Sequence, residues 1–94
     1  DVDLENARQQ VVERAKVDGI GASISHEELT EWMGLKSGAD FEVFMYWFKH
    51  LNTQLVIEDN LQLEVSVEEK CFYITRPKKS FRKKMSAIRH GPIH

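Results

Sequence analysis

The chain has 94 residues, 41% of them hydrophobic and 10% aromatic, with a formal net charge of −2. This length allows one domain with one hydrophobic core, and the composition is that of a folded chain, which excludes a disordered polymer. No apolar run approaches the roughly 18 residues of a membrane-spanning helix, so no membrane span is expected.

The single cysteine and the first residue bear on where the protein works. Cys71 cannot form an internal disulfide, which favours a reducing, intracellular location, either cytoplasmic or nuclear. The chain begins with Asp1 and shows no signal-peptide pattern. We therefore expect a processed or excised fragment, for which a larger parent protein is possible.

The charges are divided sharply along the chain. Residues 1–69 contain all 15 acidic residues and five basic ones, so their net charge is −10. Residues 70–94 contain no acid and eight basic residues, so their net charge is +8. Such asymmetry indicates contact with nucleic acid or an anionic membrane, or a tail that folds back on its own body. We divide the chain into a body, residues 1–75, and a basic C-terminal segment, residues 76–94.

Two helices and a short extended piece are predicted at the start of the chain. The first helix covers residues 4–16, with Asp3 as its cap, and an extended piece follows at 22–24. Ser25 and Glu28 have the spacing of a capping box, in which each side chain bonds the other residue's backbone N–H. They predict a second helix that begins after Ser25 and stops at Gly34.

Residues 38–51 are predicted to form the central helix, with Ser37 as its cap and Asp40 favourable in its first turn. Apolar residues at helical spacing predict its core face: Phe41, Phe44, Met45, Phe48 and Leu51. Further apolar or aromatic residues widen this stripe: Val43, Tyr46, Trp47 and His50. These four either pack in the core or form an exposed patch for a dimer or a protein partner, because Trp and Tyr often anchor interfaces.

After residue 51 the apolar period changes from helical to alternating. A short strand is predicted at 55–57, and a half-buried strand at 61–67, where Leu61, Leu63, Val65 and Val67 alternate with polar residues. Residues 68–70 would form a hairpin tip, and residues 71–75 a returning strand. A last, basic helix is predicted at 81–90.

This order of elements resembles the winged helix-turn-helix superfamily. The residues that carry the resemblance are 24–35, with the sequence ISHEELTEWMGL, which is similar to a second helix and its turn. The resemblance covers roughly residues 4–75 and implies an α+β, winged-helix-like fold. That fold would have three helices and a small antiparallel sheet, with 38–51 as the third helix and 61–75 as the hairpin called the wing.

No motif indicates catalysis or metal binding. The four histidines share no metal-ligand spacing with one another or with Cys71: His26, His50, His90 and His94. Cys71 lies in a predicted strand without a basic helix terminus to activate it, so a buried structural thiol is expected. We therefore expect no enzyme, no metal and no cofactor.

Two functions follow from these patterns. One is a small nucleic-acid-associated regulatory protein, acting in transcription or replication, whose basic arm binds phosphates without sequence preference. Its candidate residues are Arg76, Lys78, Lys79, Arg82, Lys83, Lys84 and Arg89. The other is a winged-helix protein–protein adaptor that binds a partner or a second copy through Val43, Tyr46, Trp47 and His50. DNA and RNA are not distinguished by these patterns.

Overall fold

A computed structural model describes residues 1–78 of the chain. Its elements follow in the order α1 (Leu4–Asp18), β1 (Ser23–Ser25), α2 (His26–Trp32), α3 (Phe41–Gln54), the π-helical turn η1 (Leu55–Asp59), β2 (Gln62–Ser66) and β3 (Cys71–Thr75). Within this part of the chain the α+β class is confirmed, with three α-helices and a three-stranded antiparallel sheet. The helix predicted at 81–90 lies outside the described residues.

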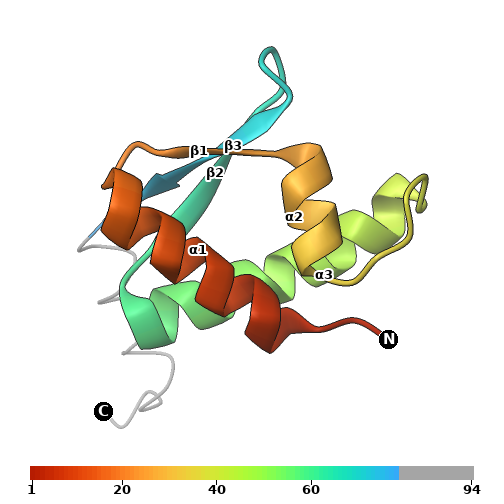
Figure 1. Ribbon diagram of the computed structural model, residues 1–94, viewed down its shortest axis with the longest axis horizontal. Coiled ribbons are helices and arrows are strands. Elements are labelled where there is room, and N and C mark those ends of the chain that lie inside the picture. Colours follow the sequence, from red (N-terminus) through yellow and green to blue (C-terminus); the bar gives the residue numbers. More distant parts are fainter. Residues whose placement is uncertain (79–94) are drawn as a thin grey trace, which may run out of the picture.

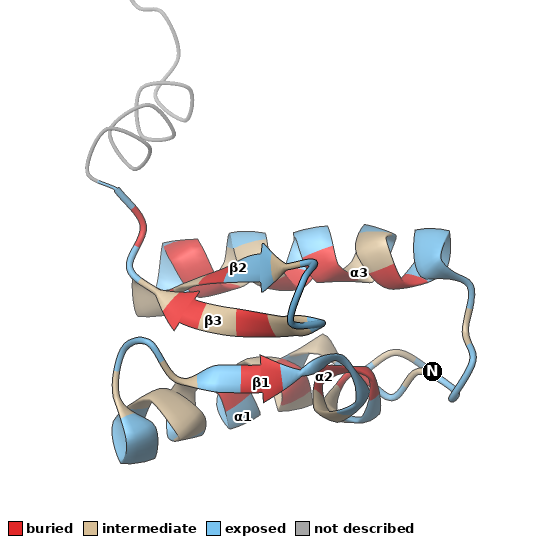
Figure 2. Ribbon diagram, turned by 90° about the horizontal axis from the view of Figure 1, so that it is seen from above, coloured by how far each residue is buried: buried red, intermediate tan, exposed pale blue. Residues whose placement is uncertain are grey.

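The sheet has the strand order β1-β3-β2, so β3 lies in the centre and β2 at one edge. In Figure 1 the helices lie below the sheet, and the tip of the β2–β3 hairpin rises away from them. Seen from above, α3 runs alongside β2, whereas α1 and α2 lie on the side of β1 (Figure 2). The edge of the sheet at β2 therefore faces α3.

The core is centred on three aromatic rings. Phe72, on β3, has its ring centroid 4.9 Å from that of Phe48 and 5.8 Å from that of Phe44, both on α3. All three side chains are buried, as predicted for the two residues of α3. The rest of the buried core comes from every element: Ala7, Val11, Ile24, Leu29, Met33, Leu51, Leu55, Leu61, Leu63 and Ile74.

The predicted starts of the first two helices are confirmed. The Asp3 carboxylate accepts a hydrogen bond from the backbone N–H of Asn6 at 3.0 Å. Ser25 Oγ accepts from the N–H of Glu28 at 3.0 Å, and the Glu28 carboxylate accepts from the N–H of Ser25 at 3.1 Å. Both halves of the capping box are present, so four residues suffice to define the start of α2.

The third helix begins later than predicted. It covers Phe41–Gln54 instead of 38–51, and its cap is Asp40, whose carboxylate accepts from the N–H of Glu42 at 3.1 Å. The prediction of Ser37 as the cap is wrong. Gly38 has φ of +82°, which lies outside the helical region, so no helix can run through this position.

The strand predicted at 55–57 is also wrong, because α3 continues directly into η1. Leu55 and Val56 are buried there, so the helical path protects the apolar residues on which the strand prediction depended. Asn60, with φ of 55°, adopts the left-handed conformation that ends the turn. A short apolar run fits a strand and a buried helix equally well.

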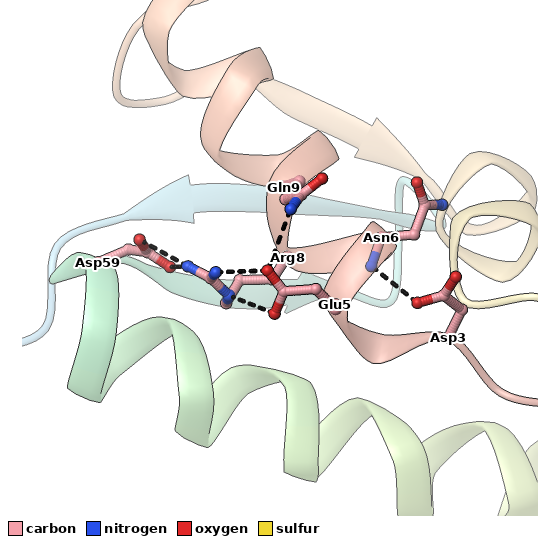
Figure 3. A network of polar contacts seen from close by, with 6 residues as sticks. All are labelled: Asp3, Glu5, Asn6, Arg8, Gln9 and Asp59. Carbon is pink, nitrogen blue, oxygen red and sulfur yellow. Dashed lines mark hydrogen bonds and ion pairs between the residues drawn. The ribbon is translucent and has the colours of Figure 1, made fainter.

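Arg8 fastens α1 to the end of η1 (Figure 3). One guanidinium nitrogen, Nη1, donates to both carboxylate oxygens of Asp59, at 3.0 and 2.9 Å, which forms an ion pair. It also donates to Glu5 at 2.6 and 3.2 Å, and this hydrogen bonding lowers the pKa of Glu5. Arg8 thereby connects two segments that lie 51 residues apart in the sequence.

Truncating the core rings should cost far more than truncating an exposed ring of the same helix. We expect Phe44→Ala and Phe48→Ala each to lower the free energy of unfolding by about 3–5 kcal/mol. Phe41→Ala is the control, since that side chain is 66% exposed, and should cost less than about 1 kcal/mol. Urea titration followed by circular dichroism measures all three, and equal losses would contradict the packing described here.

Removing the capping box should give coupled losses of stability. Ser25→Ala should cost about 1 kcal/mol, and Glu28→Ala somewhat more, because Glu28 also accepts from Arg14 at 2.7 Å. In a double-mutant cycle the sum of the two single losses in unfolding free energy should exceed the loss measured for the double variant. Glu27→Ala is the control, since Glu27 is exposed and takes no part in the box. Strictly additive effects of Ser25→Ala and Glu28→Ala would exclude the reciprocal bonds.

Candidate functional site

The four residues predicted to contact a partner lie at neighbouring positions of α3, and we call them the aromatic patch: Val43, Tyr46, Trp47 and His50. Val43 is 43% and Tyr46 58% exposed, His50 is exposed, and Trp47 is half-buried against the core. The Tyr46 ring lies 5.0 Å from that of Trp47 and 4.8 Å from that of His50, both edge-on. The structure therefore brings three rings of the patch together on the surface.

A second apolar surface, not predicted from the sequence, lies on the other flank of α3. It is a groove of about 470 Å³ between the N-terminal half of α3 and the distal half of the β2–β3 hairpin. We call it the α3–β2 groove, and its apolar walls are Phe41, Met45, Val65, Val67, Cys71 and Phe72. His26 and Glu27 of α2, Ser66 of β2 and Lys70 of the hairpin tip complete the lining.

Three residues of this groove contradict the predicted core. Phe41, Val65 and Val67 are expected to be buried from their periodicity, yet they are 66%, 54% and 81% exposed. Phe41 lies in the first turn of α3, and both valines lie near the hairpin tip that extends away from the helices (Figure 1). Among the elements of residues 1–78, none covers these two ends, so their apolar side chains are exposed there.

Polar contacts hold β2 to α3 at Leu63, two residues before Val65 of the groove. The backbone N–H of Leu63 donates to Asn52 Oδ1 at 2.8 Å, and Asn52 Nδ2 donates to the carbonyl of Leu63 at 3.3 Å. One side chain of α3 thus satisfies both backbone groups of one residue of the edge strand. This pair of bonds fixes the distance between the two walls next to the groove.

The surroundings of the groove are mainly acidic. Glu27 lines it, Glu42 adjoins Phe41, and Glu68 and Glu69 belong to the hairpin turn. The hydroxyl of Tyr73 donates to the Glu69 carboxylate, and this bond raises the pKa of Tyr73. Among the described residues, Lys70 is the one Lys or Arg that lines the groove and opposes these four carboxylates.

The structure describes only two of the seven predicted phosphate-binding residues, Arg76 and Lys78. Both are exposed, and together with Lys49 of α3 they line a depression of about 570 Å³ beside the first half of β2. Arg76 also donates to the carbonyl of Asn60 at 3.3 Å. The grouping of Lys49 with Arg76 and Lys78 was not predicted. The other candidates lie outside the described residues: Lys79, Arg82, Lys83, Lys84 and Arg89.

The remaining candidates for chemistry have structural contacts. The His26 ring packs 4.4 Å from that of Phe44, and Ser25 Oγ is engaged in the capping box. Cys71 is half-buried in the lining of the groove, where the sequence predicts a fully buried thiol. Residues 1–78 contain no group of three or more His, Cys, Asp or Glu side chains that could hold a metal ion. In the same range, none of the helices has the length and apolar character to cross a membrane.

Comparison with protein-family models, with curated proteins and with solved structures identifies no match to this chain. Its function is therefore inferred from its own residues and their contacts.

Proposed function

We propose that this chain is a protein-interaction domain of the winged-helix type, which binds a protein partner through the exposed apolar residues of α3. Two features support the winged-helix type: the element order α1-β1-α2-α3-β2-β3, and the short strand β1 that completes the sheet beside β3. In this proposal α3 is the third helix and the β2–β3 hairpin is the wing.

The chemistry of the exposed side of α3 carries the proposal. A helix that enters a DNA groove presents donors to base edges and to phosphates. Here the exposed residues include Phe41, Val43 and Tyr46, the acid Glu42 stands among them, and Lys49 is the only Lys or Arg of α3. Phosphates would be repelled by Glu42, whereas a protein surface would remove the apolar side chains from water.

The aromatic patch has the composition of an interface anchor. Tyr and Trp are enriched among the residues that contribute most to protein–protein affinity, since they bury a large area and lose little rotamer freedom. The edge-on contacts of Tyr46 with Trp47 and His50 hold the ring of Tyr46 in place before any partner arrives. A preorganised ring loses less entropy on binding than a free one.

Binding through α3 should be lost on replacing its exposed apolar residues. Peptides and small domains that bind the immobilised wild-type chain are first selected by display. Soluble variants of the chain then compete for these binders, and the strength of competition is measured. We expect Tyr46→Ser or Phe41→Ser to compete about tenfold or more weakly than the wild-type chain, because each removes an anchor. Gln10→Ser, on the exposed side of α1, is the matched control and should compete like the wild-type chain.

These binders should also tolerate high salt, since an apolar interface depends little on screening. The proposal would be contradicted if both α3 variants competed for the binders as well as the wild-type chain does. The interface would then lie elsewhere on the chain.

The charge division supports a second candidate, a nucleic-acid-associated regulatory protein whose basic C-terminal segment binds phosphates. Arg76 and Lys78 lie together with Lys49 on one surface, and five more bases follow in the sequence. Lys and Arg residues that displace counterions give sequence-independent affinity. Exposed ion pairs with the acidic body are worth only about 0–1 kcal/mol each, so a dense polyanion should displace them.

If this second function holds, replacing Lys83 and Lys84 with Ala should weaken binding equally for unrelated duplexes. It should lower the slope of log K against log salt by roughly two, about one for each lost phosphate contact. The matched control replaces Lys16 and Lys36, two exposed lysines of the body, and changes the net charge equally. Fluorescence anisotropy over a salt series measures both. Undiminished binding by a chain truncated after Thr75 would refute this second function.

A further inference from the structure

Much of the free edge of β2 is closed by the chain itself. β2 pairs with β3 on one side only, because it is the outer strand of the sheet. Just before the strand, the N–H of Leu61 donates to the carbonyl of Leu55 at 3.1 Å. At Leu63, Asn52 takes both the N–H and the carbonyl. An added strand therefore finds neither the N–H of Leu61 nor either backbone group of Leu63 free.

The pairing pattern shows where the edge is open. In an antiparallel pair, alternate residues direct both their N–H and their C=O either toward the partner strand or away from it. Leu63, opposite Ile74, directs both groups away from β3 toward Asn52. Val65, opposite Phe72, is two residues further along and directs its groups the same way. Among residues 1–78, no group takes the place at Val65 that Asn52 takes at Leu63.

This open position lies inside the α3–β2 groove. Val65 lines the groove together with Phe41 and Met45 of α3, and Phe41 and Val65 are both mainly exposed. The volume of the groove, about 470 Å³, lies within the range of roughly 300–1,000 Å³ that is typical of ligand pockets. Within the part of the chain that the structure describes, backbone groups without a pairing strand and uncovered apolar side chains therefore both belong to Val65, which is the combination that strand addition requires.

We propose that an extended segment of a protein partner adds to β2 at Val65 as a fourth strand of the sheet. One residue of the segment exchanges two backbone hydrogen bonds with Val65. Its side chain lies on the same face as Val65 and packs toward Phe41 and Met45, because directly opposed residues of two strands share a face. This mode of binding rests on the protein-interaction function proposed above and specifies it.

The charges around the groove define the chemistry of the segment. Glu27 lines the groove, and Glu42, Glu68 and Glu69 adjoin its lining residues in sequence, whereas Lys70 is the single Lys or Arg in the lining formed by residues 1–78. An acidic segment would meet repulsion there. The complementary occupant has apolar residues at its centre and Lys or Arg at its ends, since electrostatic complementarity favours the correct partner and excludes wrong ones.

The test uses the full chain, labelled with ¹⁵N, and a terminally blocked peptide of alternating valine and threonine with a lysine at each end. We expect a saturable NMR shift of the Val65 amide and slower hydrogen exchange of its N–H. Methylating the one peptide amide that bonds Val65 should weaken binding about tenfold or more, since a net backbone bond is worth roughly 1 kcal/mol and the methyl group adds a clash. Methylating the adjacent amide, which points away, should leave the affinity within about twofold.

Protein variants give an independent arm of the same test. Val65→Pro removes an N–H that points away from β3, a position at which edge strands tolerate proline. It should abolish peptide binding, which is then read from the amides of Glu64 and Ser66, because proline has no amide N–H of its own. Val65→Ala keeps the N–H and should retain binding. If Val65→Pro does not fold, the methylated peptides still decide the question on the unchanged protein.

Several results would overturn the proposal. Equal losses at every methylated position, or binding that leaves the Val65 amide unchanged, exclude strand addition. If displayed binders still depend on Phe41 or Tyr46, the protein-interaction function survives that failure. A Val65 amide that is already protected in the free chain and is released by truncation after Lys78 would make residues 79–94 the occupant. A dimer in sedimentation that Val65→Pro dissociates would make a second copy the occupant.

Discussion

The contact of Phe72 with Phe44 and Phe48 is the interaction on which the rest of the structure depends. It joins the central strand to the middle of α3 through three buried rings. Because helix and hairpin are joined there, the first turn of α3 and the distal half of the hairpin extend beyond the contact. Phe41 and Val65 lie on these uncovered ends. The same packing that secures the core therefore also creates the exposed apolar groove.

Polar contacts make this groove a preformed feature. Asn52 ties α3 to Leu63, and Arg8 ties α1 to Asp59 in the turn between α3 and β2. The Asn52 bonds join the two elements that form the walls, so α3 and β2 cannot separate at Leu63 without breaking them. A site held open in this way loses little conformational entropy when it is occupied, which favours affinity in a small domain.

The features that the sequence predicts well are those decided within a few residues. Asp3 and the pair Ser25–Glu28 cap their helices because capping bonds reach only two or three positions. Periodicity, by contrast, tells which face of an element is apolar and not how far a neighbouring element extends over it. Phe41 and Val65 follow the core pattern and are nevertheless exposed. The aromatic patch is visible in the sequence as one of two alternatives, whereas the groove depends on the alignment of α3 with β2 and leaves no local signal.

Asn52 has a consequence for solubility. A fully open edge strand is a template on which further copies pair one after another, the route to fibrous aggregates. By occupying Leu63, Asn52 interrupts that template and leaves Val65 as an isolated pairing position. In the proposed complex one short segment would bind there, but too few backbone bonds would be available to propagate a sheet from molecule to molecule. A single amide side chain would thus limit this edge to one bound segment and oppose polymerisation.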